Sequence, residues 1–204
     1  MSLHPGDIVE KYVVEGVIGQ GAMATVYRVR HQQLRSVHAL KVLHVHNDSV
    51  KNRMIQEGMV QSKLIHPNIV SVTDIVEVQA APGLVMEFVD GPTLDRWLQE
   101  HRPTIDEAEA LFVGILSGME KAHSEGMIHR DLKPANIMYD PEGQEARLLD
   151  FGIARDAEDD PAQRLTRAGF FVGTLQYVAP EALSGELVNE QADVYSLATI
   201  AYHL

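Results

Sequence analysis

Residues 129–136 read His-Arg-Asp-Leu-Lys-Pro-Ala-Asn, and this octet decides the fold. It places a carboxylate, Asp131, and an amide, Asn136, on one tight loop directly before an apolar run predicted to be a strand. Held at a fixed separation, the carboxylate can accept a hydrogen bond from a substrate hydroxyl, and the amide can bind a metal ion. Lys133 between them can follow a phosphate as a mobile point charge. The octet therefore predicts a catalytic loop rather than a structural turn.

A second acidic site follows the same pattern of strand and loop. The apolar runs Ile137–Tyr139 and Ala146–Leu149 flank the turn residues 140–143, which predicts a short hairpin. Asp150-Phe151-Gly152 closes the second run. A carboxylate at a strand end, followed by glycine, is a suitable position for a Mg²⁺ ligand because this ion prefers oxygen donors.

A glycine-rich segment near the N-terminus suggests contact with phosphate. Residues 19–26 read Gly-Gln-Gly-Ala-Met-Ala-Thr-Val, between two predicted strands. Glycines allow backbone amides to approach phosphate oxygens closely. Taken alone, the segment is more often an ordinary hairpin. Its strand-turn-strand setting excludes the dinucleotide-binding fingerprint, which a helix follows, and it lacks the Gly-Lys-Ser/Thr of a P-loop.

Lys41 lies in the middle of an apolar strand, Val37–Leu43. A charge in that setting is costly unless it has a partner or its head reaches solvent. Glu57, in the middle of a predicted helix over residues 50–64, is a candidate partner that would hold Lys41 against phosphates. An exposed helical glutamate is the alternative interpretation of Glu57, and the two residues alone do not decide between them.

The pattern of apolar and turn residues changes near residue 90. Before it, short β-branched runs alternate with turn residues, and we expect strands over residues 12–18, 25–30, 37–43, 70–78 and 84–88. After it, the pattern is helical: Thr104–Glu107 forms a capping box, Gly126 ends the helix, and a last helix begins near Asn189. We therefore expect an α+β fold with a small β-rich lobe, about 8–89, and a mainly helical lobe, about 90–204, with a cleft between them.

The ordered set of motifs resembles the eukaryotic-type protein serine/threonine kinases, and its bacterial members most. The set comprises the glycine-rich loop, the strand lysine, the helix glutamate, the His-Arg-Asp loop, Asp150-Phe151-Gly152 and Ala179-Pro180-Glu181. Each motif alone is weak to moderate, but six in order are close to decisive. The resemblance covers the chain from about Tyr12 onward. Lys133, with Gly173-Thr174 before the last motif, is similar to the serine/threonine branch rather than the tyrosine branch.

The resemblance implies ATP and Mg²⁺ (or Mn²⁺) as cofactors, with Asn136 and Asp150 binding the metal. It implies catalytic roles for Asp131, Lys133, Lys41 and Glu57. Val26, Ala39 and Met138 would enclose the adenine ring, Met86 would be the gatekeeper, and Glu87 to Val89 would form the hinge. The implied nucleotide contacts are Ile18, Gly19, Gln20, Gly21, Ala22, Met23, Ala24, Val26, Ala39, Lys41, Met86, Glu87, Val89 and Met138.

Arg130, directly before Asp131, suggests control by phosphorylation. A phosphate on a nearby loop would pair with this guanidinium and order the loop. We expect Thr166 to be the main autophosphorylation site and Thr174 to be structural, its hydroxyl linking Asp131 and Lys133. An unmodified loop threonine is the alternative for Thr166.

Several positions depart from the pattern of the family. Ala24 stands where the third loop glycine is usual, Ala198 replaces a helix glycine, and Gln61 occupies a position usually taken by an apolar residue. The family's domain is also longer than this chain, which stops inside the helix that begins near Asn189. The arginine that would pair with Glu181 is missing. We therefore expect a partial domain, poorly stable or nearly inactive in isolation.

The composition of the chain limits the functional classes and cellular locations that we expect for it. The formal net charge of −12 argues against a nucleic-acid platform. The chain has no cysteine, no apolar run long enough to span a membrane and no signal-like N-terminus, so we expect a cytoplasmic segment without membrane contact, possibly tethered by regions outside it. Protein substrates are the expected partners, with self-association possible for autophosphorylation. A pseudokinase scaffold and a small-molecule kinase are the alternatives to a protein kinase.

Overall fold

The computed structural model describes residues 2–21, 24–44, 48–79, 81–151, 175–183 and 189–204. Within the first helix, the side chains of residues 48–50, 53 and 57 are outside this description. The chain divides into two compact units, which are described separately below. The first comprises Met1–Ile65 and Val70–Phe88, and the second comprises His66–Ile69 and Val89–Leu204.

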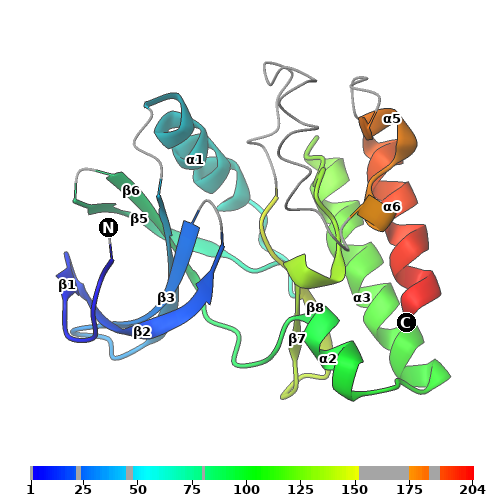
Figure 1. Cartoon of the computed structure of the whole chain (residues 1–204), viewed down its shortest axis with the longest axis horizontal. Coiled ribbons are helices and arrows are strands. Elements are labelled where there is room, and N and C mark those ends of the chain that lie inside the picture. Colours follow the sequence, from blue (N-terminus) through cyan, green and yellow to red (C-terminus); the bar gives the residue numbers. More distant parts are fainter. Residues whose placement is uncertain (1, 22–23, 45–47, 80, 152–174, 184–188) are drawn as a thin grey trace. The chain divides into compact units, whose positions relative to one another are not determined.

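A six-stranded antiparallel sheet forms the first unit (Figure 1). Its spatial order is β1-β2-β3-β4-β6-β5, so the last two strands of this sheet exchange places at the edge. The strands are β1 (Ile8–Val9), β2 (Tyr12–Gln20), β3 (Ala24–His31), β4 (Val37–Leu43), β5 (Val72–Val78) and β6 (Ala81–Glu87). All five predicted strands are present: β4 has the predicted bounds, and the other four differ by a few residues. The two-residue β1 was not predicted.

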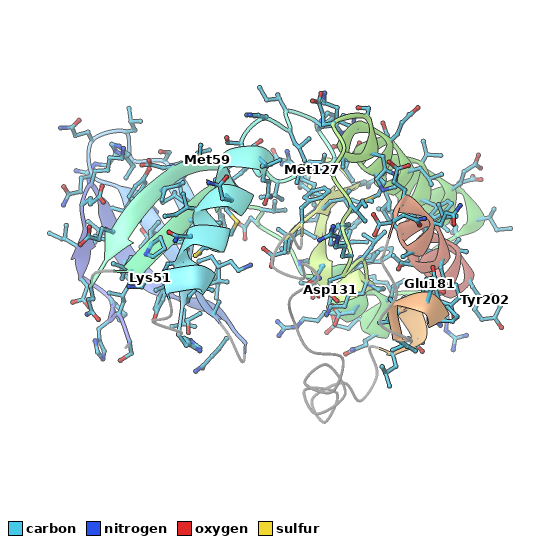
Figure 2. All side chains as sticks on the ribbon, turned by 90° about the horizontal axis from the view of Figure 1, so that it is seen from above. Lys51, Met59, Met127, Asp131, Glu181 and Tyr202 are labelled. Carbon is cyan, nitrogen blue, oxygen red and sulfur yellow. The ribbon has the colours of Figure 1, made fainter. Side chains whose placement is uncertain are left out.

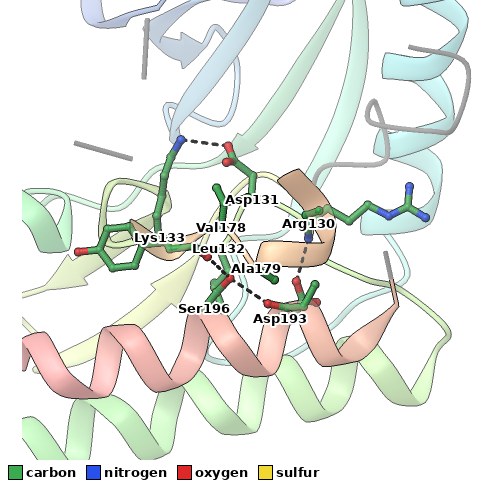
Figure 3. Close-up of a pocket in the computed structure, with 11 residues that line it drawn as sticks. Arg130, Asp131, Leu132, Lys133, Val178, Ala179, Asp193 and Ser196 are labelled. Atoms are coloured by element: carbon green, nitrogen blue, oxygen red, sulfur yellow. Dashed lines mark hydrogen bonds and ion pairs between the residues drawn. The ribbon is translucent and has the colours of Figure 1, made fainter. Parts of the chain in front are cut away.

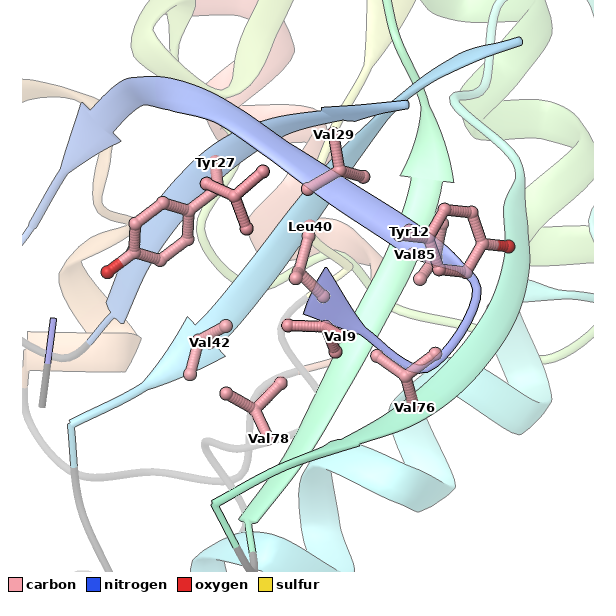
Figure 4. Close-up of a cluster of buried hydrophobic side chains, with 10 residues drawn as sticks. Val9, Tyr12, Tyr27, Val29, Leu40, Val42, Val76, Val78 and Val85 are labelled. Atoms are coloured by element: carbon pink, nitrogen blue, oxygen red, sulfur yellow. The ribbon is translucent and has the colours of Figure 1, made fainter. Parts of the chain in front are cut away.

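One face of this sheet is the core of the unit. Along β3 the side chains of Thr25, Tyr27 and Val29 are buried, while those between them are half-buried, as a period of two requires. Tyr27 and Val29 join Leu40 of β4 and Val85 of β6 in one apolar cluster (Figure 4). The opposite face therefore carries the alternate residues of the same strands.

Helix α1 (Asp48–Gln61) packs against β5 and β6. It begins and ends earlier than the predicted range 50–64. The helix ends at Gln61 because the chain turns there, where the amide of Leu64 bonds to the carbonyl of Gln61. Gln61 itself is buried, and its side-chain amide donates to the carbonyl of Val70 at 3.0 Å. A polar residue is tolerated at this position because that hydrogen bond satisfies it.

The second unit is mainly helical. Its elements are α2 (Leu94–Glu100), α3 (Ile105–Ser124), η1 (Pro134–Asn136), β7 (Ile137–Asp140), β8 (Glu145–Leu148), η4 (Leu175–Tyr177), α5 (Pro180–Leu183) and α6 (Glu190–His203). The predicted capping box is present at the start of α3, where Thr104 and Glu107 bond reciprocally. Gly126 adopts a φ of 74° just beyond the end of α3, which confirms its role as the stop.

The segment 66–69, between α1 and β5 in sequence, belongs to the second unit. Asn68 is buried there, and its side chain donates to the carbonyl of Ala146 at 2.9 Å. Gly114 and Gly118 of α3 allow this approach: a Cβ on Gly118 would lie 3.1 Å from the Asn68 carbonyl oxygen, and one on Gly114 would lie 2.7 Å from the Asn68 amide nitrogen. The segment thus does more than end a helix, since it fixes α3 against β8.

Helix α6 begins where the sequence predicts, because the Asn189 side chain accepts a hydrogen bond from the amide of Gln191. One side of the helix is buried, including Asp193, Leu197 and Ile200. The other side is exposed, and Tyr202 extends away from the unit (Figure 2).

Candidate active site

The loop after α3 brings three predicted site residues into direct contact. Lys133 Nζ and Asn136 Nδ2 each lie 3.1 Å from Asp131 Oδ2, and Asn136 Nδ2 also donates to the Asp131 backbone carbonyl at 2.8 Å. Pro134 opens the single turn of η1, where its missing N–H costs nothing, and this turn returns Asn136 to Asp131. Arg130, Asp131 and Lys133 line a pocket together with Tyr177 and residues of α6 (Figure 3).

Asp193 of α6 binds the backbone of this loop through its carboxylate. Its Oδ2 accepts from the backbone amide of His129 at 2.8 Å, and its Oδ1 accepts from that of Arg130 at 2.9 Å. His123 Nε2 lies 2.9 Å from Oδ2, and the Asp193 side chain is only 1% exposed. A buried carboxylate is stable when it accepts several hydrogen bonds. Sequence reasoning assigned no site role to Asp193.

His129 joins the loop to the second acidic motif. Its Nε2 lies 2.9 Å from the Leu149 carbonyl oxygen, and its ring packs at 4.9 Å from that of Phe151. Both rings are almost completely buried. The amide of Leu149 donates to the carbonyl of Asn136 at 2.9 Å, so the residue before Asp150 is bonded to the other predicted metal ligand.

Two site residues have left-handed backbone conformations. The φ angle is 62° at Arg130 and 49° at Asp150. Such angles are uncommon for residues other than glycine and concentrate at functional sites, where the surrounding structure enforces them. At Arg130 the hydrogen bond from the backbone amide to Asp193 Oδ1 contributes to that constraint.

The donor set of this loop fits a hard divalent cation. Asn136 uses its Nδ2 toward Asp131, so its amide oxygen is the atom that could bind a metal, and the carboxylate of Asp150 is the second predicted ligand. No group of three or more His, Cys, Asp or Glu side chains with metal-site geometry occurs among the described residues. A magnesium ion held by two protein side chains, with phosphate oxygens and water completing its shell, is consistent with this arrangement.

Four predicted nucleotide residues of the first unit, Val26, Ala39, Lys41 and Met86, share one face of its sheet. Val26 pairs with Lys41 across β3 and β4, and Ala39 pairs with Met86 across β4 and β6. This face is opposite to the one that carries Leu40 into the core. The glycine-rich loop is the turn between β2 and β3, closed by a hydrogen bond from the Gly21 amide to the Ala24 carbonyl at 2.9 Å.

Other predicted residues are placed individually. Ile18, Gly19 and Gln20 lie at the end of β2, Glu87 ends β6, and Met138 of β7 forms a bridge with Thr93. Val89, the first residue of the second unit's longer part, is buried. The side chain of Glu57 and residues Ala22, Met23, Thr166, Gly173 and Thr174 lie outside the described part of the chain. The Lys41–Glu57 pair and the regulatory threonines therefore stay predictions.

Comparison with known proteins identifies the family. The profile described as "Protein kinase domain" matches residues 12–204. The chain belongs to the protein kinase family. It is 39% identical to the serine/threonine-protein kinase pkn3 of Myxococcus xanthus over 97% of this chain, and 38% identical to PkaA of Streptomyces coelicolor over 95%. Both alignments span 38% of the relative's own length.

Solved structures of this kinase family match the whole chain. The kinase domain of PknI from Mycobacterium tuberculosis superimposes with a TM-score of 0.77 at 30% identity, covering 100% of this chain and 77% of that one. These matches confirm the predicted fold class, α+β with the two-lobed kinase fold, and the resemblance to bacterial members of the family.

Burial of His129 predicts a pH dependence of stability in this kinase domain. Burial holds the pKa of its imidazole below the ordinary value of 6.5, although the carboxylates of Asp193 and Asp131 act in the opposite direction. Below pH 6.5 the unfolded chain therefore binds a proton at this position that the folded chain does not. The free energy of unfolding should fall as pH decreases from 6.5 toward the lower folded-state pKa.

Urea unfolding at a series of pH values, with wild type and His129→Phe compared, measures this contribution. The variant should lose less stability between neutral and mildly acidic pH. His38, whose pKa burial also lowers, remains in both proteins and cancels in the comparison. An unchanged slope in the variant would mean that other groups cause the acid sensitivity.

Proposed function

We propose that this chain is a serine/threonine protein kinase domain that transfers the γ-phosphoryl group of ATP to a hydroxyl of a protein. The contact of Asp131 with Lys133 and Asn136 carries the proposal, because a carboxylate, an ammonium and an amide grouped on one loop would serve as proton acceptor, cation for phosphate and metal ligand. We assign residues 8–89 and 90–204 to the two lobes of the kinase domain. Because the chain spans 38% of the length of these relatives, the activity of the whole protein is part of the proposal.

In the proposed reaction, the substrate hydroxyl oxygen attacks the γ-phosphorus, and the bond from that phosphorus to the β–γ bridging oxygen breaks, releasing ADP. Asp131 orients the hydroxyl and accepts its proton. Lys133 stabilises the charge on the transferred group. Bound Mg²⁺, held by Asn136 and Asp150, would neutralise phosphate charge.

The proposal assigns nucleotide roles to residues of both units. Lys41, with Glu57 as its partner, would hold the phosphates, and the loop residues 19–24 would cover them. Val26, Ala39 and Met138 would enclose the adenine ring, while the backbone of Glu87 and Val89 would bond its edge. The alternation of β3 and β4 supports this assignment, because it puts Val26, Ala39 and Lys41 on the sheet face away from the core.

Phosphate transfer to a generic protein such as casein tests the function. The protein should label serine and threonine of casein from γ-labelled ATP, and a chelator of Mg²⁺ should abolish the labelling. Label on a small-molecule acceptor alone would favour a small-molecule kinase. Nucleotide binding without any transfer would favour a pseudokinase scaffold.

We further propose regulation through Arg130. Its backbone is left-handed, and its amide donates to Asp193 Oδ1, so the start of this side chain is anchored on the loop that carries Asp131. A phosphate on Thr166 would pair with the Arg130 charge and order the loop that carries Thr166. The hydroxyl of Thr174 would bond Asp131 and Lys133. Autophosphorylation would take place between two copies of the chain.

Peptide mapping after incubation with Mg-ATP tests this regulatory proposal. We expect phosphate on Thr166, and a Thr166→Val variant with lower transfer to casein. Phosphate at other positions with none on Thr166 would contradict the assignment.

We place these activities in the cytoplasm, with protein substrates as partners and no nucleic acid. Within the part of the chain that the structure describes, no helix is long and apolar enough to cross a membrane.

A further inference from the structure

Two arginines of β3 and one glutamate of β2 lie together on one face of the sheet. Arg28 Nη1 contacts Glu15 Oε2, and Arg30 Nε lies 2.5 Å from Glu15 Oε1. Arg30 also donates to the Arg35 carbonyl at 2.9 Å. One carboxylate therefore joins two guanidinium groups, which fixes Arg28 more firmly than a single exposed ion pair would.

The guanidinium of Arg28 also lies over an aromatic ring. Its Cζ is 5.3 Å from the centroid of Phe88, within the range of a cation–π contact. Phe88 is the residue between Glu87 and Val89, whose backbone we propose as the adenine-binding hinge. The amide of Glu87 is already bonded to the Ser71 carbonyl at 2.9 Å, so the start of this segment is held from the β5 side as well.

Sheet register places Arg28 on the face proposed to bind the nucleotide. It directly opposes Ala39 across β3 and β4, two residues along the strand from Val26. Residues separated by two along a strand share a face. Arg28 is thus next to Val26 and Ala39, which are proposed to contact adenine, but its charged end is already bound to Glu15 and Phe88.

We propose that Arg28 is a positioning residue of the nucleotide site, which fixes the hinge at Phe88 in the conformation that binds adenine. This role rests on the proposed function. The physical reason is preorganisation: a hinge segment held in place before ATP binds loses less conformational entropy on binding. Arg28 would not touch the nucleotide, so its effect should appear in ATP affinity rather than in the chemical step.

The simpler interpretation is a surface charge cluster that contributes only to stability. Lys11 offers a matched control in the same unit, because it makes the same two kinds of contact. Its Nζ lies 2.8 Å from Asp74 Oδ2 and 5.7 Å from the centroid of the Tyr12 ring. Lys11 has no contact with Phe88 among those that the structure describes, so its replacement removes an ion pair and a cation–π contact without affecting the hinge.

The experiment compares Arg28→Met with Lys11→Met, which both keep an unbranched apolar stem and remove the charge. Calorimetric titration with Mg-ATP should show Kd raised about two- to fivefold in Arg28→Met, the equivalent of one exposed cation–π contact, and unchanged in Lys11→Met. Turnover at saturating ATP should stay at the wild-type rate. Arg28→Met should cause no further loss in a Phe88→Leu background, because the contact is already absent.

The outcomes separate this role from the function on which it rests. Equal ATP affinity in wild type and Arg28→Met would overturn the positioning role and leave the kinase proposal intact. Equal losses in Arg28→Met and Lys11→Met would show a general stability effect and also overturn it. A wild-type protein that binds no Mg-ATP would contradict the proposed function itself. If Arg28→Met does not fold, Glu15→Gln, which releases the guanidinium without removing it, should give the same rise in Kd.

Discussion

Replacing Asp131 with asparagine should lower the turnover of phosphate transfer by about 10²–10⁴-fold, the usual contribution of a positioned general base. The substitution keeps the shape of the side chain but removes the negative charge that accepts the hydroxyl proton. The affinity for Mg-ATP should change little, because the proposed role of Asp131 concerns the hydroxyl and not the nucleotide. The measurement is a steady-state assay with casein and labelled ATP, together with calorimetric titration of Mg-ATP.

Glu142→Gln is the matched control for Asp131→Asn. It removes one carboxylate charge from the same unit, at an exposed position in the turn between β7 and β8. This variant should retain wild-type turnover and ATP affinity. If Asp131→Asn retained full turnover, the catalytic base would have to be sought elsewhere, and a loss of folding in that variant would be detected by its unfolding transition.

Much of the second unit could be predicted because its signals are local. The capping box at Thr104 and the stop at Gly126 each depend on residues within one turn of the helix end, and both are present. The loop from His129 to Asn136 is likewise a short segment whose residues bond to each other. Helix α2 was not predicted, since it is short and Thr93 makes no side-chain cap bond.

The contacts that join distant segments could not be predicted from the sequence. Asn68 reaches Ala146, and Gln61 satisfies its amide on Val70, because the fold brings backbone carbonyls to these side chains. Nothing in a local pattern specifies such a carbonyl. The contact between Arg28 and Phe88 could not be predicted either. In the sequence, Arg28 is one of two arginines that alternate with apolar residues along β3, and only the fold brings the Phe88 ring to its guanidinium.

Asp193→Ala should have the largest effect on stability, a loss of about 2–5 kcal/mol in the free energy of unfolding. The carboxylate is buried, and its removal leaves the amides of His129 and Arg130 without their acceptor. Leaving a buried donor unpaired costs its full desolvation penalty. Chemical denaturation of the wild type and the variant measures the difference.

Two further variants serve as controls for Asp193→Ala. Asp193→Asn keeps one acceptor oxygen and should lose less stability than Asp193→Ala, whereas Glu190→Gln removes an exposed acid from the first turn of the same helix and should change stability little. The loop that carries Asp131 depends on the two amide bonds to Asp193, so transfer activity should fall in parallel with stability. Because a loosened base is misplaced rather than absent, the loss of turnover should be smaller than in Asp131→Asn. Wild-type stability in Asp193→Ala would show that the amides find other partners and that α6 does not hold the catalytic loop.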